Sequence, residues 1–214
     1  MVIFLFFSLL YVTESQDKIA QIVQVQEDYQ QTQAKIARDL KVLMTPHLAD
    51  WNADLQDSTL TIRFFQGEDI LFEQGKATMS PYFQKVLDNF FPKYMELLQQ
   101  PDIWDWIEAL HIEGHTSSEG DYFKNIELSQ QRANKVLYHL WRLDHFSDKE
   151  KQWLQQKIAT IGMGSKETID VDGREDVQQS RRVTFSLVVK PMLNVIPKDR
   201  LFTVEPLDLE KAEF

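Results

Sequence analysis

Apolar and polar residues divide the chain into segments of different periodicity. The first twelve residues, MVIFLFFSLLYV, form one uninterrupted apolar run. From Ser15 to about Thr45 a polar, Gln-rich stretch without Gly or Pro carries apolar residues three and four positions apart. This spacing predicts a helix with one narrow apolar seam. We expect Pro46 to end the helix, because proline cannot continue the hydrogen-bond ladder. The seam consists of Ile19, Ile22, Val25, Tyr29, Ile36, Leu40 and Leu43.

Two interpretations of this seam remain open. A short coiled coil or a helix lying on a partner has this pattern, and a solvated connector with a single packed face has it equally well.

The apolar run at the start of the chain is too short to cross a bilayer. Twelve helical residues span about 18 Å, against a hydrocarbon core of roughly 30 Å. A signal peptide needs a basic segment before the run and a small-residue cleavage site after it, whereas residues 13–16 read TESQ. A buried core segment is the alternative. We expect residues 1–13 to be the second half of a transmembrane helix that begins upstream.

Beyond the seam, the periodicity alternates between that of strands and that of helices. Period-two alternation of apolar and β-branched residues predicts strands at 59–64, 107–113, 157–162 and 182–189. Three-and-four spacing predicts helices at about 81–98, 122–143 and 147–156. We expect Pro92 to bend or break the first of these helices, residues 101–106 to form a linker, and residues 163–178 to form a polar loop.

Local residues support these helix boundaries. Ser80 and Pro81 match an N-cap followed by the first helical position, and Ser147 with Glu150 matches a capping box. On the second helix, the residues expected to face inward are Leu128, Val136, Leu137, Leu140 and Trp141.

The order β-α-β-α-β-β predicts a two-layer α+β domain with its helices on one face of a mixed sheet. This domain would occupy residues 54–190. A helical stalk at 14–53 and the partial transmembrane helix at 1–13 would precede it, and an irregular tail at 191–214 would follow.

Composition excludes several functions. The net charge of −10 argues against a nucleic-acid partner, which usually requires a basic face. The chain has no cysteine, so neither a disulfide framework nor a thiolate nucleophile is available. It also lacks a Gly-x-Ser-x-Gly elbow and a glycine-rich phosphate loop. An enzyme is therefore the weaker hypothesis, and we expect no cofactor.

The segment HIEGH, residues 111–115, contains two histidines and a glutamate. In a strand, His111, Glu113 and His115 share one face, so a metal site is conceivable. The helical zinc motif requires a different spacing, and no further histidine lies at a useful distance along the chain. Hydrogen bonding by these side chains is the preferred interpretation, and we expect no metal.

The stretch from Glu113 to Ala133, EGHTSSEGDYFKNIELSQQRA, is the strongest candidate for a binding site. Asn125, Leu128 and Arg132 follow one another at offsets of three and four, which places them on one face of a helix. Arginine is well suited to hold a carboxylate. A structural ion pair is the alternative role for Arg132.

Four motifs in this chain resemble the OmpA-like peptidoglycan-binding domain. They are ILFEQGKATMSP (70–81), the run from GHTSSEG to NIELSQQRA (114–133), IGMGS (161–165) and GREDVQQSRRV (173–183). All four occur in the family's order over about 130 residues, and the family fold agrees with the one predicted above.

The resemblance implies non-catalytic binding of the diaminopimelate stem peptide of peptidoglycan. In the family, an Asp after Gly-x-Thr meets the ligand's ammonium, and an Arg fifteen residues later completes the pair. These positions are Ser117 and Arg132 here, so the carboxylate is missing, and Glu119 or Asp121 could replace it. The site residues that the resemblance implies are Thr116, Ser117, Asn125, Leu128, Arg132 and Arg182.

The N-terminal segments are similar to those of MotB-like stator subunits, and the HTSS loop is similar to that of defence-associated MotB-like proteins of the Zorya kind. This similarity implies a single-pass inner-membrane protein with a periplasmic domain, dimeric through its stalk, beside a MotA-like membrane subunit. Because Ser117 carries no charge, the alternative is a protein-interaction scaffold of the same fold that has lost the wall ligand. A hydrolase acting on the wall is a third, weaker possibility.

Overall fold

A computed structural model describes residues 2–143 and 146–190 of the chain. The described residues fall into two units, of which one holds residues 2–31 and the other is Thr32–Val189. The helices are α1 (Val2–Leu48), α2 (Pro81–Leu98), α3 (Pro101–Trp104), α4 (Tyr122–Trp141), α5 (Asp148–Lys157) and α6 (Val177–Ser180). The strands are β1 (Ala53–Gln56), β2 (Thr61–Phe65), β3 (Ile107–His115), β4 (Ile158–Gly164), β5 (Asp170–Val171), β6 (Arg174–Glu175) and β7 (Arg182–Val189).

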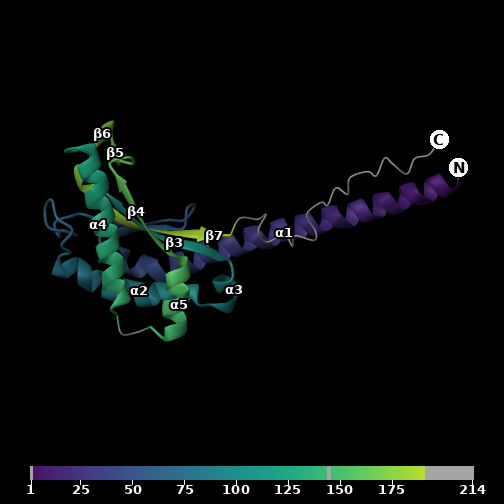
Figure 1. The fold of residues 1–214 in the computed structure, drawn as a ribbon, viewed down its shortest axis with the longest axis horizontal. Coiled ribbons are helices and arrows are strands. Elements are labelled where there is room, and N and C mark those ends of the chain that lie inside the picture. Colours follow the sequence, from purple (N-terminus) through teal and green to yellow (C-terminus); the bar gives the residue numbers. More distant parts are fainter. Residues whose placement is uncertain (1, 144–145, 191–214) are drawn as a thin grey trace. The chain divides into compact units, whose positions relative to one another are not determined.

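Five strands form a mixed sheet in the order β1-β2-β7-β3-β4. β3 and β4 are parallel and are joined through α4 and α5, while the remaining neighbours are antiparallel. Figure 1 shows α4 lying along β3 and β4. The four predicted strands and the α+β class are thus confirmed. The edge strand β1 was not predicted, because its four residues show no alternation of apolar and polar side chains.

The helix α1 continues through Pro46, so the prediction that this proline ends it is wrong. Pro46 lies in the last turn, where its missing N–H removes a single backbone bond. The turn after the helix closes through Trp51 N–H donating to the carbonyl of His47 at 3.1 Å, and Asn52 then adopts a positive φ of 47°. Two seam residues, Ile36 and Leu40, are fully buried within the unit Thr32–Val189, and so is Met44, whereas its neighbour Leu43 in the predicted seam is half-buried.

The helix α2 also continues through a proline, Pro92, so the predicted break is absent. Interior proline costs a helix about 3 kcal/mol. Apolar residues on both sides of Pro92 are buried, and this burial holds the helix in place: Phe83, Val86, Leu87, Phe90, Phe91, Tyr94, Met95, Leu97 and Leu98. The predicted caps are confirmed, since Ser80 accepts a hydrogen bond from Phe83 N–H and Ser147 with Glu150 forms a capping box.

Aromatic rings between α2 and the sheet form the centre of the core. The Phe90 ring lies 4.9 Å from the rings of both Phe64 on β2 and Phe185 on β7, in edge-on geometry. Trp51, in the segment after α1, packs edge-on against Phe90, with the ring centroids 5.7 Å apart. Such edge-on pairs add to the stabilisation from apolar burial.

The segment 163–178 is more ordered than the predicted loop. β5 and β6 form a hairpin around Asp172 and Gly173, whose φ angles of 52° and 77° are those of a tight turn. Asp176 then caps the short helix α6. Residues 101–104 form a helix instead of the predicted linker. Before α2, an isolated antiparallel bridge joins Phe72 to Met79.

The buried face of α4 differs from the predicted one. Val136 and Leu140 are buried as expected, whereas Leu128, Leu137 and Trp141 are half-buried. Four residues of the first three turns are buried in addition: Asn125, Ser129, Arg132 and Ala133.

Within the described residues, no helix is both long and apolar enough to span a bilayer. The predicted partial transmembrane helix at 1–13 therefore stays a prediction, as do the segment boundaries at 14–53 and 54–190. The predicted tail at 191–214 lies outside the described residues.

Candidate functional site

The loop from Thr116 to Gly120 joins β3 to α4 and is held at both ends. The backbone N–H of Thr116 donates to the carbonyl of Gly164 at the end of β4, at 2.9 Å. The side-chain amide of Asn125 donates to the carbonyls of Ser117 at 3.3 Å and Glu119 at 3.0 Å. Asn125 is 8% exposed, so its amide is committed to the shape of this loop.

Two glycines allow α4 to approach the sheet closely beside this loop. A Cβ on Gly114 would lie 2.2 Å from the backbone oxygen of Ser129, and one on Gly162 would lie 2.7 Å from the backbone nitrogen of Gln130. The Ser129 hydroxyl accepts a hydrogen bond from Gly164 N–H at 2.9 Å and donates one to the carbonyl of Ile126 at 2.8 Å. The start of α4 is therefore fixed on β3 and β4.

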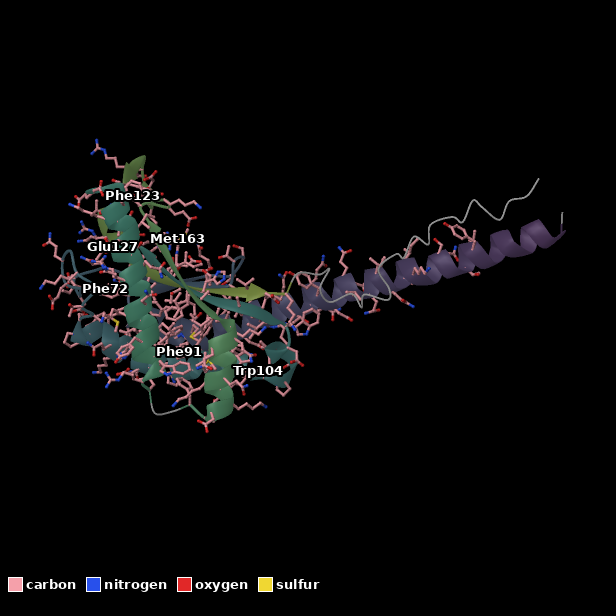
Figure 2. All side chains as sticks on the ribbon, viewed as in Figure 1. Phe72, Phe91, Trp104, Phe123, Glu127 and Met163 are labelled. Atoms are coloured by element: carbon pink, nitrogen blue, oxygen red, sulfur yellow. The ribbon has the colours of Figure 1, made fainter. Side chains whose placement is uncertain are left out.

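Arg132 lies two turns further along α4 and is only 7% exposed. Its Nε–H donates to the carbonyl of Lys76 at 3.0 Å, and its guanidinium lies over the Phe72 ring at 5.0 Å from the centroid. Figure 2 shows Phe72 on the loop before α2, with Phe123 and Glu127 on the first turns of α4. These two contacts fix the plane of the guanidinium.

No carboxylate pairs with Arg132 among the described residues, and its two Nη atoms make no hydrogen bond there. Burial, with a smaller contribution from the neighbouring Arg181, lowers the pKa of Arg132 to about 10. The group therefore stays protonated at neutral pH. It is a positioned cation with free donors, which is the arrangement that receives an anion.

Arg181 is the residue of this site that the sequence did not reveal. Its Nε–H donates to the Ser117 hydroxyl at 3.3 Å, and its Nη2 forms an ion pair with Glu119. Strand alternation was the available signal: Val183 and Phe185 face the core under the helices, and Arg181 shares their parity.

Arg182, which was predicted as a site residue, has different contacts. Its Nη1 donates to the carbonyls of Glu167 at 2.9 Å and Ser180 at 3.3 Å. Burial lowers the pKa of Arg182, and the nearby Arg63 lowers it further. No hydrogen bond or ion pair within the described residues joins Arg182 to Ser117, Asn125 or Arg132.

The remaining predicted residues surround the loop. Thr116 is 4% exposed, and its hydroxyl oxygen is buried without a hydrogen-bond partner in the described part of the chain. Ser117 is 2% exposed, beneath Arg181, and Leu128 is half-buried one turn before Arg132.

His115 and Glu113 form a buried polar network at the end of β3. The Thr184 hydroxyl donates to Glu113 Oε2 at 2.8 Å, and His115 Nε2 lies 3.5 Å from the same oxygen. Burial lowers the pKa of His115. Burial would raise the pKa of Glu113, but hydrogen bonds from His115 and Thr184 outweigh it, and the pKa is lowered. No group of three or more side chains suited to a metal ion lies together in the described residues.

A groove of about 480 Å³ runs between α2 and α4, beginning at Ala77, next to the Lys76 carbonyl that accepts from Arg132. Lys135 of α4 and Arg142, just after it, line the groove, and so do Asp88 and His139, whose Oδ1 and Nε2 lie 2.7 Å apart. Arg132 itself is not among the residues that line the groove.

Known proteins are similar to this chain in sequence or in fold. The chain is 33% identical to the Zorya protein ZorB of an Escherichia coli strain over 204 residues, which cover 91% of this chain and 85% of that protein. A second Zorya protein ZorB, from another Escherichia coli strain, is 25% identical over 82% of this chain and 71% of its own length. A MotB-like protein from Desulfovibrio vulgaris has a crystal structure that superposes with a TM-score of 0.52 at 17% identity, over 78% of this chain and 97% of that one.

Residues 71–182, the segment that holds the loop, Arg132 and Arg181, match the OmpA family. The chain therefore belongs to the OmpA family, and it is homologous to the Zorya protein ZorB.

Proposed function

We propose that this chain anchors a membrane-tethered complex to peptidoglycan without catalysing a reaction. The observation that carries the proposal is Arg132, a buried guanidinium that is held in place by Lys76 and Phe72 and has no carboxylate partner among the described residues. A buried cation without a partner is costly, so a fold that keeps one is explained by an anion that arrives from outside. Membership of the OmpA family and the homology to ZorB support the same function.

In this proposal, Arg132 holds a carboxylate of the diaminopimelate stem peptide. The unpartnered hydroxyl of Thr116 gives the ligand a second polar contact, and Asn125 keeps the loop in its binding conformation. Leu128 supplies apolar contact beside Arg132. Ser117 acts through the loop, where its hydroxyl accepts a hydrogen bond from Arg181, and Arg182 acts through the start of β7, where it donates to the Glu167 carbonyl.

The N-terminal segment would tether the chain to the inner membrane in a single pass, with the unit Thr32–Val189 in the periplasm. The apolar seam of α1 would pair two copies, and a MotA-like membrane subunit would complete a stator-like assembly of the Zorya defence type. Homology to ZorB supports this arrangement.

Co-sedimentation with purified peptidoglycan sacculi tests the proposal. Because a hydrogen bond to a charged group contributes about 1.5–3 kcal/mol, Arg132→Ala should weaken binding by at least about tenfold. Arg132→Lys keeps the charge but loses two-point contact, so its affinity for sacculi should fall between that of the parent chain and that of Arg132→Ala. Arg38→Ala removes an exposed arginine of α1 and is the matched control, which should bind as the parent chain does.

The alternative, a protein-interaction scaffold of the same fold, rests on the uncharged Ser117. It would be favoured if the chain and all three variants failed to sediment with sacculi. Release of soluble muropeptides during the incubation would instead indicate a wall hydrolase.

A further inference from the structure

Three consecutive residues of the candidate loop are bonded to one segment further along the chain, which runs from β6 to the start of β7. Ser118 donates both its backbone N–H, at 3.0 Å, and its hydroxyl to the carboxylate of Glu175. Arg181 donates its Nε–H to the Ser117 hydroxyl at 3.3 Å and forms an ion pair with Glu119. The middle of the loop therefore depends on this segment as well as on α4.

The segment is itself fixed, so it can support the loop. Glu175 lies in β6, opposite Asp170 of β5. The backbone N–H of Asp176 donates to the carbonyl of Ile169 at 2.7 Å, and the backbone N–H of Ile169 donates to the hydroxyl of the fully buried Ser180 at 3.0 Å. The carboxylate of Glu175 thus reaches the loop from a hairpin whose flanking residues bond to each other and to α6.

The contact from Glu175 is stronger than the one from Arg181. A carboxylate that accepts two hydrogen bonds makes charge-assisted contacts, which are roughly twice as strong as bonds between neutral groups. Burial would raise the pKa of Glu175, but the hydrogen bonds from Ser118 outweigh it and the pKa is lowered, so the group is charged at neutral pH. The ion pair of Arg181 involves a Glu119 side chain that is 63% exposed, and exposed ion pairs contribute little. Glu175 therefore makes the principal contact between the segment and the loop.

The loop needs such support because it has no regular secondary structure of its own. It carries unused polar groups, since the Thr116 hydroxyl and the backbone N–H groups of Ser117 and Glu119 make no hydrogen bond within the described residues. Such groups converge on a ligand only while the backbone keeps one conformation, and the apparent affinity falls with the time that the loop spends in others. Fixing Ser118, which lies among these groups, therefore raises the affinity without a contact to the ligand.

We propose that Glu175 is a positioning residue for ligand binding, which holds Ser118 and so keeps the loop in the conformation that receives the ligand. The proposal rests on the wall-binding function proposed above and adds a residue that acts on the loop instead of on the ligand. The two hydrogen bonds from Ser118, the fixed hairpin that carries Glu175 and the unused polar groups around Ser118 support it.

Co-sedimentation of the full chain in detergent with purified sacculi measures the effect. Glu175→Ala releases Ser118, and a loop that keeps its binding conformation for about a fifth of the time should lower the apparent affinity about fivefold. Glu175→Gln keeps one acceptor oxygen and should cause a smaller loss. Asp170→Ala removes an exposed carboxylate of the same hairpin whose side chain makes no hydrogen bond within the described residues, and this matched control should bind as the parent chain does.

Two further measurements separate positioning from a general structural role. Ser118→Ala combined with Glu175→Ala should weaken binding little more than Glu175→Ala alone, because both changes break the same contact. Hydrogen exchange followed by mass spectrometry should be faster in Glu175→Ala for peptides that cover residues 116–120, and unchanged for peptides from α2. A residue needed for the whole fold would instead speed up exchange in both regions.

Unchanged affinity of Glu175→Ala for sacculi would overturn this inference. Tighter binding would overturn it as well, because the carboxylate would then compete with the ligand for Ser118. A fully additive loss in the double variant, or faster exchange in α2, would assign Glu175 another role. Where Glu175→Ala does not fold, Glu175→Gln and Ser118→Ala decide, and unchanged binding by both would refute the proposal.

Arg132→Ala distinguishes this inference from the function on which it rests. If Arg132→Ala weakened sacculi binding while Glu175→Ala left it unchanged, the wall-anchoring function would stand without the positioning role. If the parent chain itself did not sediment with sacculi, both would fail.

Discussion

Arg132 keeps a positive charge at a position where 7% of its surface reaches solvent. Its Nε and the face of its guanidinium are satisfied by the Lys76 carbonyl and the Phe72 ring, which lowers the cost of burial without neutralising the charge. The Nη donors are left for a ligand. A residue of this kind is explained by binding better than by stability, because buried charges usually destabilise a fold unless they are paired.

His115 gives the domain a pH dependence whose sign follows from its burial. Its pKa is lowered in the folded chain, so the unfolded chain takes up this proton at a higher pH than the folded chain does. Stability that is present above about pH 6.5 should therefore be lost as the pH falls through the folded pKa. Glu113, whose pKa is also lowered, loses its contribution as the pH falls further below its ordinary range.

Urea unfolding between pH 7 and pH 5 measures this effect. His115→Gln should flatten the dependence of the unfolding free energy on pH, by at most about 1.4 kcal/mol per pH unit for one proton. His111→Gln, at a half-buried position of the same strand, shows what the loss of an imidazole does by itself. If the unfolding free energy of His115→Gln changed with pH as steeply as that of the parent chain, His115 would not be the titrating group.

For the individual residues of the site, helical spacing in the sequence was enough to place Asn125 and Arg132 on one buried face of α4. It could not reveal that Asn125 serves the loop, because that role depends on the carbonyls of Ser117 and Glu119 turning toward it. Arg181 was missed because the sequence shows two adjacent arginines and does not show that Ser117 lies against the residue before β7.

Among the elements, α4 depends on its close contact with β3. A Cβ on Gly114 would lie 2.2 Å from a backbone oxygen of α4, and backbone atoms cannot move aside as a side chain can. Gly114→Ala should therefore destabilise the fold by about 3 kcal/mol, at the upper end of the cost of overpacking. Thermal unfolding measures this as a lowered midpoint.

The control is Gly75→Ala. Gly75 has a φ of 67° and no atom within 4 Å of an added Cβ, so only backbone strain of about 1 kcal/mol is expected there. If both variants lost the same stability, the contact between α4 and β3 would not be the cause.

At the two prolines, burial of apolar side chains outweighs the helix-breaking effect that proline has locally. Proline rules predicted an end at Pro46 and a bend or break at Pro92, yet both helices continue. Burial of residues such as Phe90 and Tyr94 offsets one lost hydrogen bond. The hairpin around Asp172 and Gly173 is the opposite case, because an Asp-Gly pair is a recognised turn signal that could have been used.

For the whole molecule, the seam of α1 predicts the oligomeric state. Replacing Ile19, Ile22 and Val25 with Gln keeps helix propensity but removes the apolar seam. The full chain in detergent should then change from dimer to monomer in sedimentation velocity experiments. Replacing Gln21 and Gln26 with Ala on the same helix should leave the dimer intact, and a parent chain that is itself monomeric would contradict the prediction.

The fold class followed from the order of strands and helices along the chain, because each main element has a clear period. The strand order β1-β2-β7-β3-β4 did not, since it depends on contacts between residues far apart in sequence, such as Ile62 with Phe185. The short elements were not predicted from the sequence either. β1, β5, β6 and α3 have two to four residues each, which are too few to show a period.

The place of β3 between β7 and β4 in the sheet has a mechanical consequence. β3 is hydrogen-bonded to β7 on one side and to β4 on the other, and the candidate binding loop begins where β3 ends. A pull along the axis of β3 would load both ladders in shear, so their hydrogen bonds would resist together instead of opening one by one. Pulled in that direction, a domain that holds on to a wall would rupture only at high force.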